Sequence, residues 1–285
     1  MSNKDLLTDA ELESYRPDPI MLEHIERCRA GFGVAKEDFR IVDWGCGRGR
    51  LVLWLCEQGY DAVGVDLDSA PFANGADLIR SKGYEVEKLL YRLGPQSTLS
   101  LPDSSFHFVT SEQTLEHVRD LEGLVAEWSR LTMEGGGGFH TYPPHRRIVE
   151  PHLFMPLVHW LPKGAVRKWL IGFFVLLRID PDWWPNLRVP WGEKVRAYYA
   201  YSTQETFYRS TEVVRGHLAA QGFVTEFVDL DAARPGRKAV RKWLPSGPST
   251  KLVQIWYMNC GAILGLATYR RSSTLKPFGR AKRHM

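Results

Sequence analysis

The chain has 285 residues, of which 44% are apolar and 25% are charged, a composition that indicates a globular protein with a full hydrophobic core. Its four cysteines (Cys28, Cys46, Cys56 and Cys260) form no CxxC pair and no His/Cys cluster, which excludes a disulfide framework and a zinc site of those types. The net charge of +4 is uneven, because residues 232–285 hold twelve Lys and Arg and no acidic residue, whereas residues 1–231 hold 25 basic and 33 acidic residues.

The N-terminal segment carries charges throughout and has no apolar run of the kind found in secretory signals, so we expect a cytoplasmic protein. Thr8 and Glu11 have the spacing of a helix capping box. The stretch PDPIMLEHIERCRAGFG then predicts a helix that Pro19 opens and that Gly31 and Gly33 end.

From residue 39 onward the chain alternates between strand and helix patterns. Strands are predicted at about residues 39–44, 61–66, 84–88, 106–111 and 137–142, with helices at about 49–58, 69–82 and 118–132. This alternation predicts a parallel sheet that is covered by helices on both faces.

The alternation stops after the fifth predicted strand. Residues 145–200 are rich in proline and hold five of the ten tryptophans, namely Trp160, Trp169, Trp183, Trp184 and Trp191. Nine consecutive apolar residues, 169–177, would reach about 14 Å as a helix, too short for a bilayer core of ~30 Å. We predict an insertion whose apolar run fills the core of a cap, closes over a hydrophobic substrate or lies in a bilayer interface.

Regular patterns return at residue 201. Ser202 or Thr203 is predicted to cap a helix that Gly222 ends, and VTEFVDL predicts the next strand. Residues 232–251 form a basic connection rich in proline and glycine. Residues 252–269 carry no charge, but their polar residues and glycines favour a buried helix and the closing strand CGAILGLATY over a membrane span.

A glycine-rich loop follows the first predicted strand, in the sequence DWGCGRGR. A strand that runs through such a loop into a helix presents backbone N–H groups and a helix N-terminus to a ligand. The dinucleotide fingerprint GxGxxG needs a third glycine where this chain has Arg50, which disfavours a nicotinamide-dependent oxidoreductase. The pattern present instead is Asp43, Gly45, Gly47 and Gly49.

That pattern resembles motif I of the class I S-adenosylmethionine-dependent methyltransferases. AVGVDLD is similar to the second-strand motif of this family, in which an acidic residue, here Asp66, accepts hydrogen bonds from the ribose diol. LPDSSFHFVTSEQTLEHV resembles the fourth-strand motif, and LVAEWSRLTMEGGGGFHTYPP resembles the next helix and the fifth strand. The matches run in order from residue 40 to residue 144, and YSTQETFYRSTEVVRGHLAAQGF resembles the helix before the sixth strand.

The resemblance implies a doubly wound, Rossmann-like α/β fold. Its seven strands would follow the order 3-2-1-4-5-7-6, with the last strand antiparallel and the aromatic-rich insertion after the fifth. The chain would then divide into N-terminal helices (1–38), a cofactor-binding core (39–144), a substrate cap (145–200) and a C-terminal part (201–285) that completes the sheet and carries the basic tail.

The resemblance also implies S-adenosyl-L-methionine as the cofactor. The residues expected to bind it are Asp43, Gly45, Cys46, Gly47, Gly49, Asp66, Leu67, Gln96, Ser111 and Glu112. Two positions depart from the family pattern. His107 stands where the family often has Asp, and Gln96 is only the nearest residue by count to the acidic group that commonly contacts adenine.

Methyl transfer to an oxygen needs a base, and titratable residues gather just past the fifth predicted strand. Histidine is the side chain best suited to accept a proton near neutral pH. We expect His145 or His152 to be the base, with Glu150 orienting it. His117 of the LEHV motif and Tyr142 are further candidates, with helix capping and core packing as their structural alternatives.

Glu150 and His152 also have a spacing that suggests a metal site, because they flank a proline in an extended segment. No third ligand can be identified from the sequence, so we predict no metal.

The two apolar stretches and the basic tail favour peripheral contact with a membrane, at its inner face. They suit a small-molecule, glycan or lipid-linked acceptor, such as a quinone-like phenol. Nucleic acid ranks lower as a partner, because the aromatic residues are grouped with aliphatic ones and are not interleaved with Lys and Arg. A non-catalytic cofactor-binding or membrane-associated scaffold and a nucleic-acid methyltransferase are the alternative functions.

Overall fold

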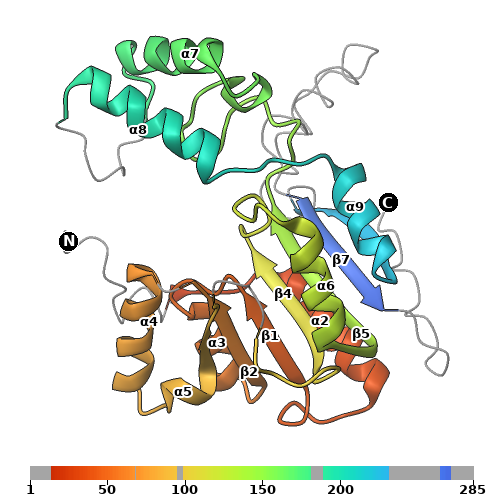
Figure 1. Cartoon of the computed structure of the whole chain (residues 1–285). Helices are drawn as coiled ribbons and strands as arrows, with labels where there is room; N and C mark the ends of the chain where they lie inside the picture. The colour runs from red at the N-terminus through yellow and green to blue at the C-terminus, as the bar shows by residue number, and fades with distance from the viewer. Residues whose placement is uncertain (1–13, 68, 95–98, 181–188, 231–263, 271–285) are drawn as a thin grey trace, which may run out of the picture.

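Seven strands form one sheet in the order β3-β2-β1-β4-β5-β7-β6 (Figure 1). The structure is a computed structural model and describes residues 14–67, 69–94, 99–180, 189–230 and 264–270. The strands are β1 (Arg40–Trp44), β2 (Asp61–Asp66), β3 (Leu90–Arg92), β4 (Phe106–Glu112), β5 (Thr132–Tyr142), β6 (Phe223–Asp229) and β7 (Leu264–Arg270). The first five are parallel, and β7 runs antiparallel to both β5 and β6. The predicted strand order and the antiparallel last strand are confirmed.

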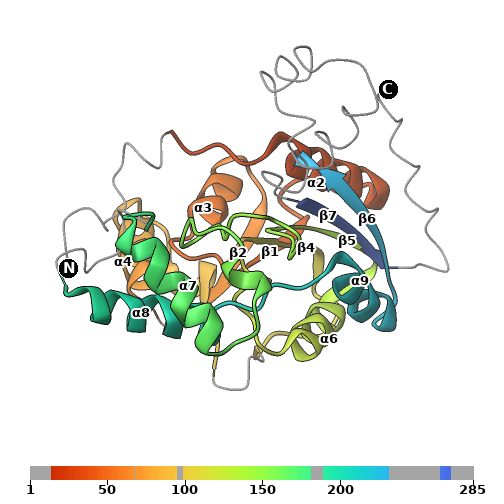
Figure 2. The same ribbon diagram turned by 90° about the horizontal axis from the view of Figure 1, so that it is seen from above.

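Helices cover both faces of this sheet, as Figure 2 shows. In chain order they are α2 (Pro19–Phe32), α3 (Arg50–Glu57), α4 (Ala70–Ser81), α5 (Val86–Leu89), α6 (Leu121–Leu131), η2 (Val158–Trp160), α7 (Ala165–Leu176), α8 (Trp191–Gln204) and α9 (Thr211–Ala220). The helices α6 and α9 share one apolar core with alternate residues of the strands, and α2 and α3 share another. Because alternate strand residues point to opposite faces, Val42 belongs to the first core and Ile41 to the second.

Local signals explain where α2 begins and ends. The Asp18 carboxylate accepts a hydrogen bond from the Ile20 amide at 2.9 Å, directly before the predicted opening at Pro19. Gly33 ends α2 in the left-handed conformation with φ of 68°, as predicted, whereas Gly31 lies inside the helix.

Two predicted elements were wrong. Residues 84–88 are not a strand, because Val86 and Leu90 have helical spacing and turn toward the same small core before β3 begins at Leu90. Ser202 and Thr203 do not cap a helix, because they lie in the last turn of α8; the helix that Gly222 follows is α9, and Ser210 caps it.

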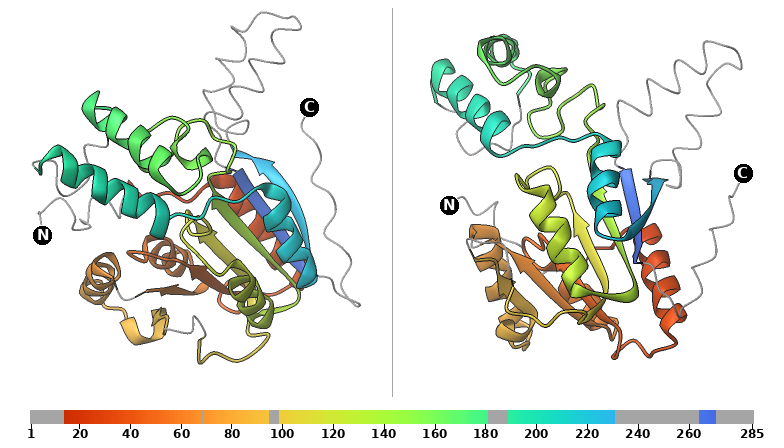
Figure 3. Two further views of the ribbon diagram at one scale, coloured as in Figure 1. Left: turned by 45° about the horizontal axis from the view of Figure 1, so that its top comes forward. Right: turned by 45° about the vertical axis from the view of Figure 1, so that its right-hand side comes forward.

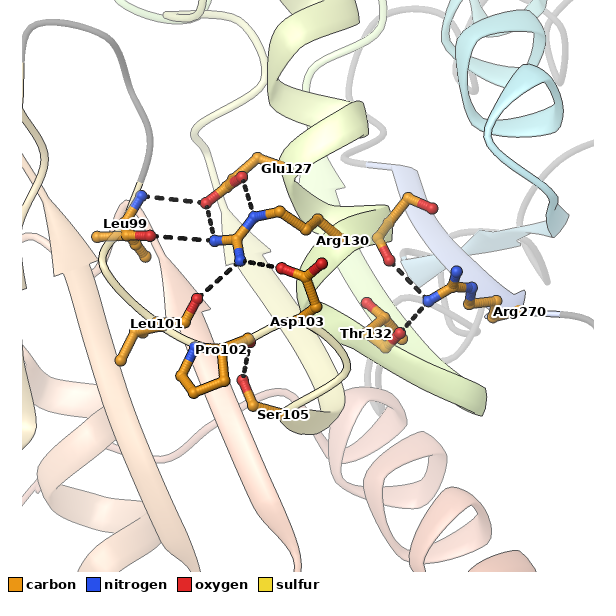
Figure 4. Close-up of polar contacts among 10 residues, drawn as sticks. Leu99, Leu101, Pro102, Asp103, Ser105, Glu127, Arg130, Thr132 and Arg270 are labelled. Atoms are coloured by element: carbon orange, nitrogen blue, oxygen red, sulfur yellow. Dashed lines mark hydrogen bonds and ion pairs between the residues drawn. The ribbon is translucent and has the colours of Figure 1, made fainter.

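Residues before β4 are held by Arg130 of α6 (Figure 4). Its guanidinium donates to the carbonyls of Leu99 and Leu101 at 3.1 and 2.7 Å and pairs with Asp103 and Glu127. The LPDSSF part of the fourth-strand motif therefore has a structural task, which is to fix the entry into β4.

The cap, defined here as residues 145–180 and 189–204, has an apolar core of its own around Ile171, Val175 and Tyr198. Its helices α7 and α8 pack closely, because the Trp191 indole donates to the Gly172 carbonyl at 3.1 Å and leaves no room for a side chain at Gly172. Figures 1 and 3 place both helices beyond the carboxyl ends of β1 and β4.

Several predictions fall on residues outside the described ranges. They concern the capping box at Thr8 and Glu11, Gln96, the tryptophans at 183 and 184, the basic connection at 232–251, and residues 252–263 of the uncharged segment. Within the described part of the chain, no helix is long and apolar enough to cross a membrane.

His140 on β5 makes stability depend on pH. It is 1% exposed, its ring stacks on Trp128 at 4.1 Å, and burial lowers its pKa to about 3. The unfolded chain, with an ordinary histidine pKa of about 6.5, takes up a proton below that pH that the folded state does not. The contribution of His140 to the free energy of unfolding is therefore complete above about pH 6.5 and is lost as the pH falls toward 3.

We expect His140→Gln to reduce the pH dependence of the free energy of unfolding, measured with urea between pH 7 and 4.5. Because the variant lacks one group that takes up a proton on unfolding, its free energy of unfolding should change less steeply with pH, by about 1.4 kcal/mol per pH unit. Equal slopes for the variant and the parent chain would contradict this assignment.

Candidate active site

The glycine loop after β1 is tied to the end of β2. Its amides at Gly45 and Cys46 donate to the Val65 carbonyl at 2.7 and 3.1 Å, and the Gly49 amide donates to the Cys46 carbonyl at 2.8 Å. The Gly47 amide donates to Oδ2 of Asp66 at 2.6 Å. The carboxylate that ends β2 therefore faces the loop, as the motifs predicted.

The three glycines of the loop serve different purposes, although all have positive φ. A Cβ at Gly45 would lie 2.2 Å from Oγ1 of Thr114, and one at Gly49 would lie 3.0 Å from Ile79. Packing therefore requires glycine at Gly45, whereas at Gly49 a Cβ would only press on the end of the Ile79 side chain. A Cβ at Gly47 would meet no described atom within 4 Å, so Gly47 is the glycine that borders open space.

The residues between these glycines are held by packing. The Sγ of Cys46 lies 2.7 Å from where a Cβ of Gly64 would be, and burial raises the pKa of this thiol. Gly75 of α4 sits against the Arg48 carbonyl, since a Cβ there would be 2.2 Å from the carbonyl oxygen. The Cys46 side chain is thus packed against β2, and α4 fits closely on the loop.

Three carboxylates gather beside the loop, those of Asp43, Asp66 and Glu112. Burial raises the pKa of each, and repulsion from Glu112 and Asp66 adds to the effect at Asp43. Asp43 is 4% exposed, and its Oδ1 has no hydrogen-bond partner among the residues that the structure describes. A buried carboxylate oxygen without a donor is costly, so this crevice suits a ligand that brings positive charge or N–H groups.

Two residues that the sequence analysis missed complete this crevice. The Tyr15 hydroxyl donates to Oε2 of Glu112 at 3.3 Å, and the Arg50 guanidinium lies 5.2 Å from the Tyr15 ring centre. Oγ1 of Thr114 donates to the carbonyls of Trp44 and Glu112. Tyr15 precedes every motif, so no spacing in the sequence points to it.

Other predicted cofactor residues differ in accessibility. Leu67 is 60% exposed, and its amide donates to Oδ1 of Asp66 at 2.6 Å. Ser111 is fully buried, and its hydroxyl lies 2.9 Å from Nδ1 of His140. The Ser111 side chain therefore points into the core and is not available to a ligand.

A second group of polar residues lies where the cap meets the LEHV segment. The rings of His117 and His152 are 4.9 Å apart. Glu150 accepts hydrogen bonds from the amides of His152 and Leu153 and from the Tyr208 hydroxyl. Burial alone would raise the pKa of Glu150, but the hydrogen bonds from His152, Tyr208 and Leu153 outweigh it and lower the pKa.

Hydrogen bonds define the tautomers of both histidines. Nδ1 of His117 lies 2.8 Å from the Glu205 carbonyl, which can only accept. Nδ1 of His152 lies 2.7 Å from the Tyr208 hydroxyl, whose own proton goes to Glu150. Both Nδ1 atoms are therefore protonated donors, and Nε2 of each neutral ring keeps a lone pair.

Glu116 adds a carboxylate to this group. It is 1% exposed, neither of its oxygens has a hydrogen-bond partner in the described part of the chain, and burial raises its pKa to about 7. One ligand atom each of Glu116, His117 and His152 lies within 4.8 Å of the others, a spacing that could accommodate a metal ion. Of the predicted pair Glu150 and His152, only His152 belongs to this group, so the set differs from the one that the sequence suggested. We call these three residues the acceptor cluster.

Two predicted catalytic residues lie elsewhere. Tyr142 is 2% exposed and packs in the core that α6 and α9 share. His145 lines a separate cavity, and its carbonyl accepts hydrogen bonds from the rings of His159 and Trp160. The structure therefore brings together His117, Glu150 and His152 but not Tyr142 or His145.

Comparison with known proteins agrees with the motifs. Residues 42–138 match the family described as "Methyltransferase domain". A ubiquinone biosynthesis O-methyltransferase from Acinetobacter baumannii (strain AYE) is 29% identical over 154 residues, which are 52% of this chain and 62% of that protein. The chain thus spans less than two thirds of the length of this relative.

Solved structures share the fold. An S-adenosylmethionine-dependent methyltransferase from Mesorhizobium loti superposes with a TM-score of 0.50 and 17% identity, over 86% of this chain and 96% of that one. The [4+2]-cyclase SpnF superposes with a TM-score of 0.51 and 15% identity, over 90% and 81% of the two chains. Identities this low establish the fold alone, and the sequence match and the fold together confirm the resemblance that the motifs predicted.

The different environments of the loop glycines can be tested by substitution. We expect Gly47→Ala to cost about 1–2 kcal/mol of unfolding free energy, from its left-handed backbone alone. Gly45→Ala should cost about 2–5 kcal/mol, because the clash with Thr114 adds overpacking to the same strain.

Urea unfolding measures both values. Gly33→Ala is the matched control, since Gly33 has φ of 68° and open space for a Cβ, and it lies far from the loop in sequence. Equal losses at Gly45 and Gly47 would show that the Thr114 contact does not shape the loop.

Proposed function

Because this chain carries a class I S-adenosylmethionine-dependent methyltransferase domain, we propose that it transfers a methyl group to an oxygen atom of a small-molecule acceptor. The observation that carries the proposal is the crevice at the glycine loop. It combines the open backbone of Gly47, the Asp66 carboxylate held against it and the buried Asp43 oxygen that lacks a donor.

The residues of this crevice fit S-adenosylmethionine group by group. The methionine ammonium would supply the donor that Oδ1 of Asp43 lacks, and the ribose hydroxyls would donate to lone pairs of Asp66 that the Gly47 and Leu67 amides leave free. The methionine carboxylate would meet the N-terminus of α3, where Gly49 provides no side-chain cap.

The charge of the crevice supports this cofactor over a dinucleotide. Three carboxylates attract the ammonium and sulfonium groups of S-adenosylmethionine, whereas they would repel the diphosphate of a nicotinamide cofactor. When bound, S-adenosylmethionine would supply a methyl group activated by its sulfonium sulfur. An acceptor oxygen would attack the methyl carbon from the side opposite that sulfur. The protein's share is to hold the acceptor and to remove its proton.

We assign proton removal to His152. Its Nδ1–H donates to Tyr208, which in turn donates to Glu150, so the ring is oriented by two groups and keeps a basic Nε2. Glu150 is 1% exposed and ionised at neutral pH, since its pKa is lowered, and it stabilises the imidazolium that forms. His117 and Glu116 border the same space and would position the acceptor.

An oxygen acceptor is supported by the relatives named ubiquinone biosynthesis O-methyltransferases. Because the match covers only part of those proteins, the identity of the acceptor in this chain rests on its own cap. We propose an amphipathic, lipid-linked acceptor that is reached at the surface of an anionic membrane.

The outer face of α7 supports this surface contact. Val166, Trp169, Phe173 and Leu176 recur at helical spacing and stay exposed, Trp169 and Leu176 to 70% and 71%, and the rings of Trp169 and Phe173 stack at 5.9 Å. Residues 145–180 hold six Lys and Arg against two acidic residues. An apolar stripe bordered by positive charge fits the interface of an anionic bilayer.

A non-catalytic cofactor-binding or scaffold protein is the alternative function. The [4+2]-cyclase SpnF shows that this fold also serves proteins whose named activity is not methyl transfer. Detection of a methylated product from any phenolic acceptor in the presence of the purified chain separates the two functions.

The cofactor assignment predicts tight, Asp66-dependent binding of S-adenosylhomocysteine in calorimetry. We expect Asp66→Asn to weaken binding by roughly 10- to 100-fold, since it removes one charge-assisted hydrogen-bonding group worth about 1.5–3 kcal/mol. Asp77→Asn, a surface change on the neighbouring helix α4, should leave the affinity unchanged. If the parent chain shows no binding, the cofactor assignment is wrong.

The base assignment predicts that His152→Gln lowers kcat by about 10²- to 10⁴-fold while the affinity for S-adenosylhomocysteine stays unchanged. Tyr208→Phe should lower kcat less, because the Glu150 carboxylate still faces the ring at 3.3 Å. Activity should survive dialysis against EDTA. A loss on dialysis that Zn²⁺ or Mn²⁺ restores would assign the acceptor cluster to a metal ion instead of a free base.

The membrane assignment predicts co-sedimentation with phosphatidylcholine vesicles that contain about one third phosphatidylglycerol, and weaker binding at high salt. Trp169→Ser combined with Phe173→Ser should lower vesicle affinity at least ~10-fold, because each buried aromatic contributes about 1.5–3 kcal/mol. Val213→Ser, at an exposed apolar position on α9, is the matched control. Equal binding by both variants would place the contact elsewhere.

A further inference from the structure

A cavity of about 280 Å³ lies beside the acceptor cluster, at the base of the cap. Its wall includes three cationic side chains (Lys163, Arg167 and Arg209), two histidines (His145 and His159) and Tyr208. Tyr208 belongs to both places, because its hydroxyl bonds to Glu150 and His152. A ligand in the cavity would therefore lie one side chain away from the proposed base.

The three cations have no anionic partner among the residues that the structure describes. Arg167 donates to the carbonyls of Leu161 and Ser202 at 2.9 and 2.8 Å, and Lys163 donates to the Thr203 carbonyl at 2.5 Å. Arg209 donates to four carbonyls, two of them in the LEHV segment. These neutral acceptors hold the side chains in place without cancelling their charge, which Glu150 at Arg167 and Asp120 at Arg209 offset only from beyond ion-pair distance.

Aromatic contacts offset the positive charge of these side chains only in part. The ring centre of Phe207 lies 4.7 Å from the Lys163 ammonium, 5.9 Å from the Arg209 guanidinium and 5.4 Å from the Arg119 guanidinium. Three cations that share one ring also repel one another. Burial lowers the pKa of Lys163, Arg167 and Arg209 alike, which shows that their charged forms are incompletely solvated.

Donors remain for a ligand after the internal hydrogen bonds are counted. Lys163 uses one of its three N–H groups, and Arg167, which is 6% exposed, uses four of its five. His159 is 7% exposed, and its Nε2 donates to the His145 carbonyl, so Nδ1 of the neutral ring is an acceptor and adds no donor. The cavity thus offers positive charge and unused polar atoms in the same small volume.

We propose that this cavity binds a phosphoryl group. A phosphoryl group carries a charge of about −1.5 to −2 and three acceptor oxygens, which matches three converging cations better than a carboxylate does. A further step rests on the proposed methyltransferase function. In this step the phosphoryl group is part of the methyl acceptor. Held beside Tyr208, it would orient the acceptor oxygen toward His152.

Calorimetry at low ionic strength tests the site without cofactor, with inorganic phosphate and pyrophosphate in one arm and monomeric dihexanoyl phosphatidic acid in the other. We expect millimolar or tighter binding in at least one arm, and at least tenfold weaker binding by Lys163→Glu. Lys163→Arg should retain the affinity. Lys168→Glu, five residues further along and with its ammonium over the Tyr199 ring, is the matched control and should bind as the parent does.

The outcomes separate the sources and the hypotheses. Binding in both arms identifies a site for free phosphate or soluble phosphate esters, and binding of phosphatidic acid alone identifies a lipid headgroup site. No binding in either arm, or equal effects of the Lys163 and Lys168 reversals, overturns the proposal. Since no cofactor is present, this failure is distinct from a failure to bind S-adenosylhomocysteine, and circular dichroism confirms that each variant is folded.

Discussion

The hydrogen bond from the Gly47 amide to the Asp66 carboxylate is the contact on which the rest of the site depends. It joins the loop after β1 to the end of β2, and it leaves the carboxylate turned toward the open side of Gly47. Packing around it is tight, with Thr114 under Gly45 and the Arg48 carbonyl against Gly75. These contacts form without a ligand, so the protein's own packing shapes the crevice, and a site shaped in advance binds with little ordering cost.

The LEHV segment connects this crevice with the proposed acceptor site. Thr114, directly before it, packs against Gly45 of the glycine loop, and the segment itself supplies Glu116 and His117 to the acceptor cluster. Arg209, which follows the cap, holds carbonyls of Leu115 and Val118. One short stretch after β4 therefore contacts the glycine loop, the acceptor cluster and the segment that follows the cap.

The sequence predicted the sheet well, because repeated strand and helix patterns and the ordered glycine, VDLD and LEHV motifs all agree. It failed at residues 84–88, where YEVEK alternates like a strand but also fits a single helical turn. Glu150 with His152 was predictable from local spacing. Tyr15, Glu116 as a partner of His152, and Tyr208 were not, because each reaches the site from a distant part of the chain through tertiary packing. Ser111 was assigned by its place in a motif, whereas the side of the strand on which it lies directs it to His140.

A crystal structure of the chain grown with saturating S-adenosylhomocysteine tests the central claim most directly. The account predicts both ribose hydroxyls within hydrogen-bond distance of Asp66, the homocysteine amine beside Asp43, and the sulfur on the side of His152. A ribose bound away from Asp66, or density for the ligand outside the crevice at Gly47, would contradict it.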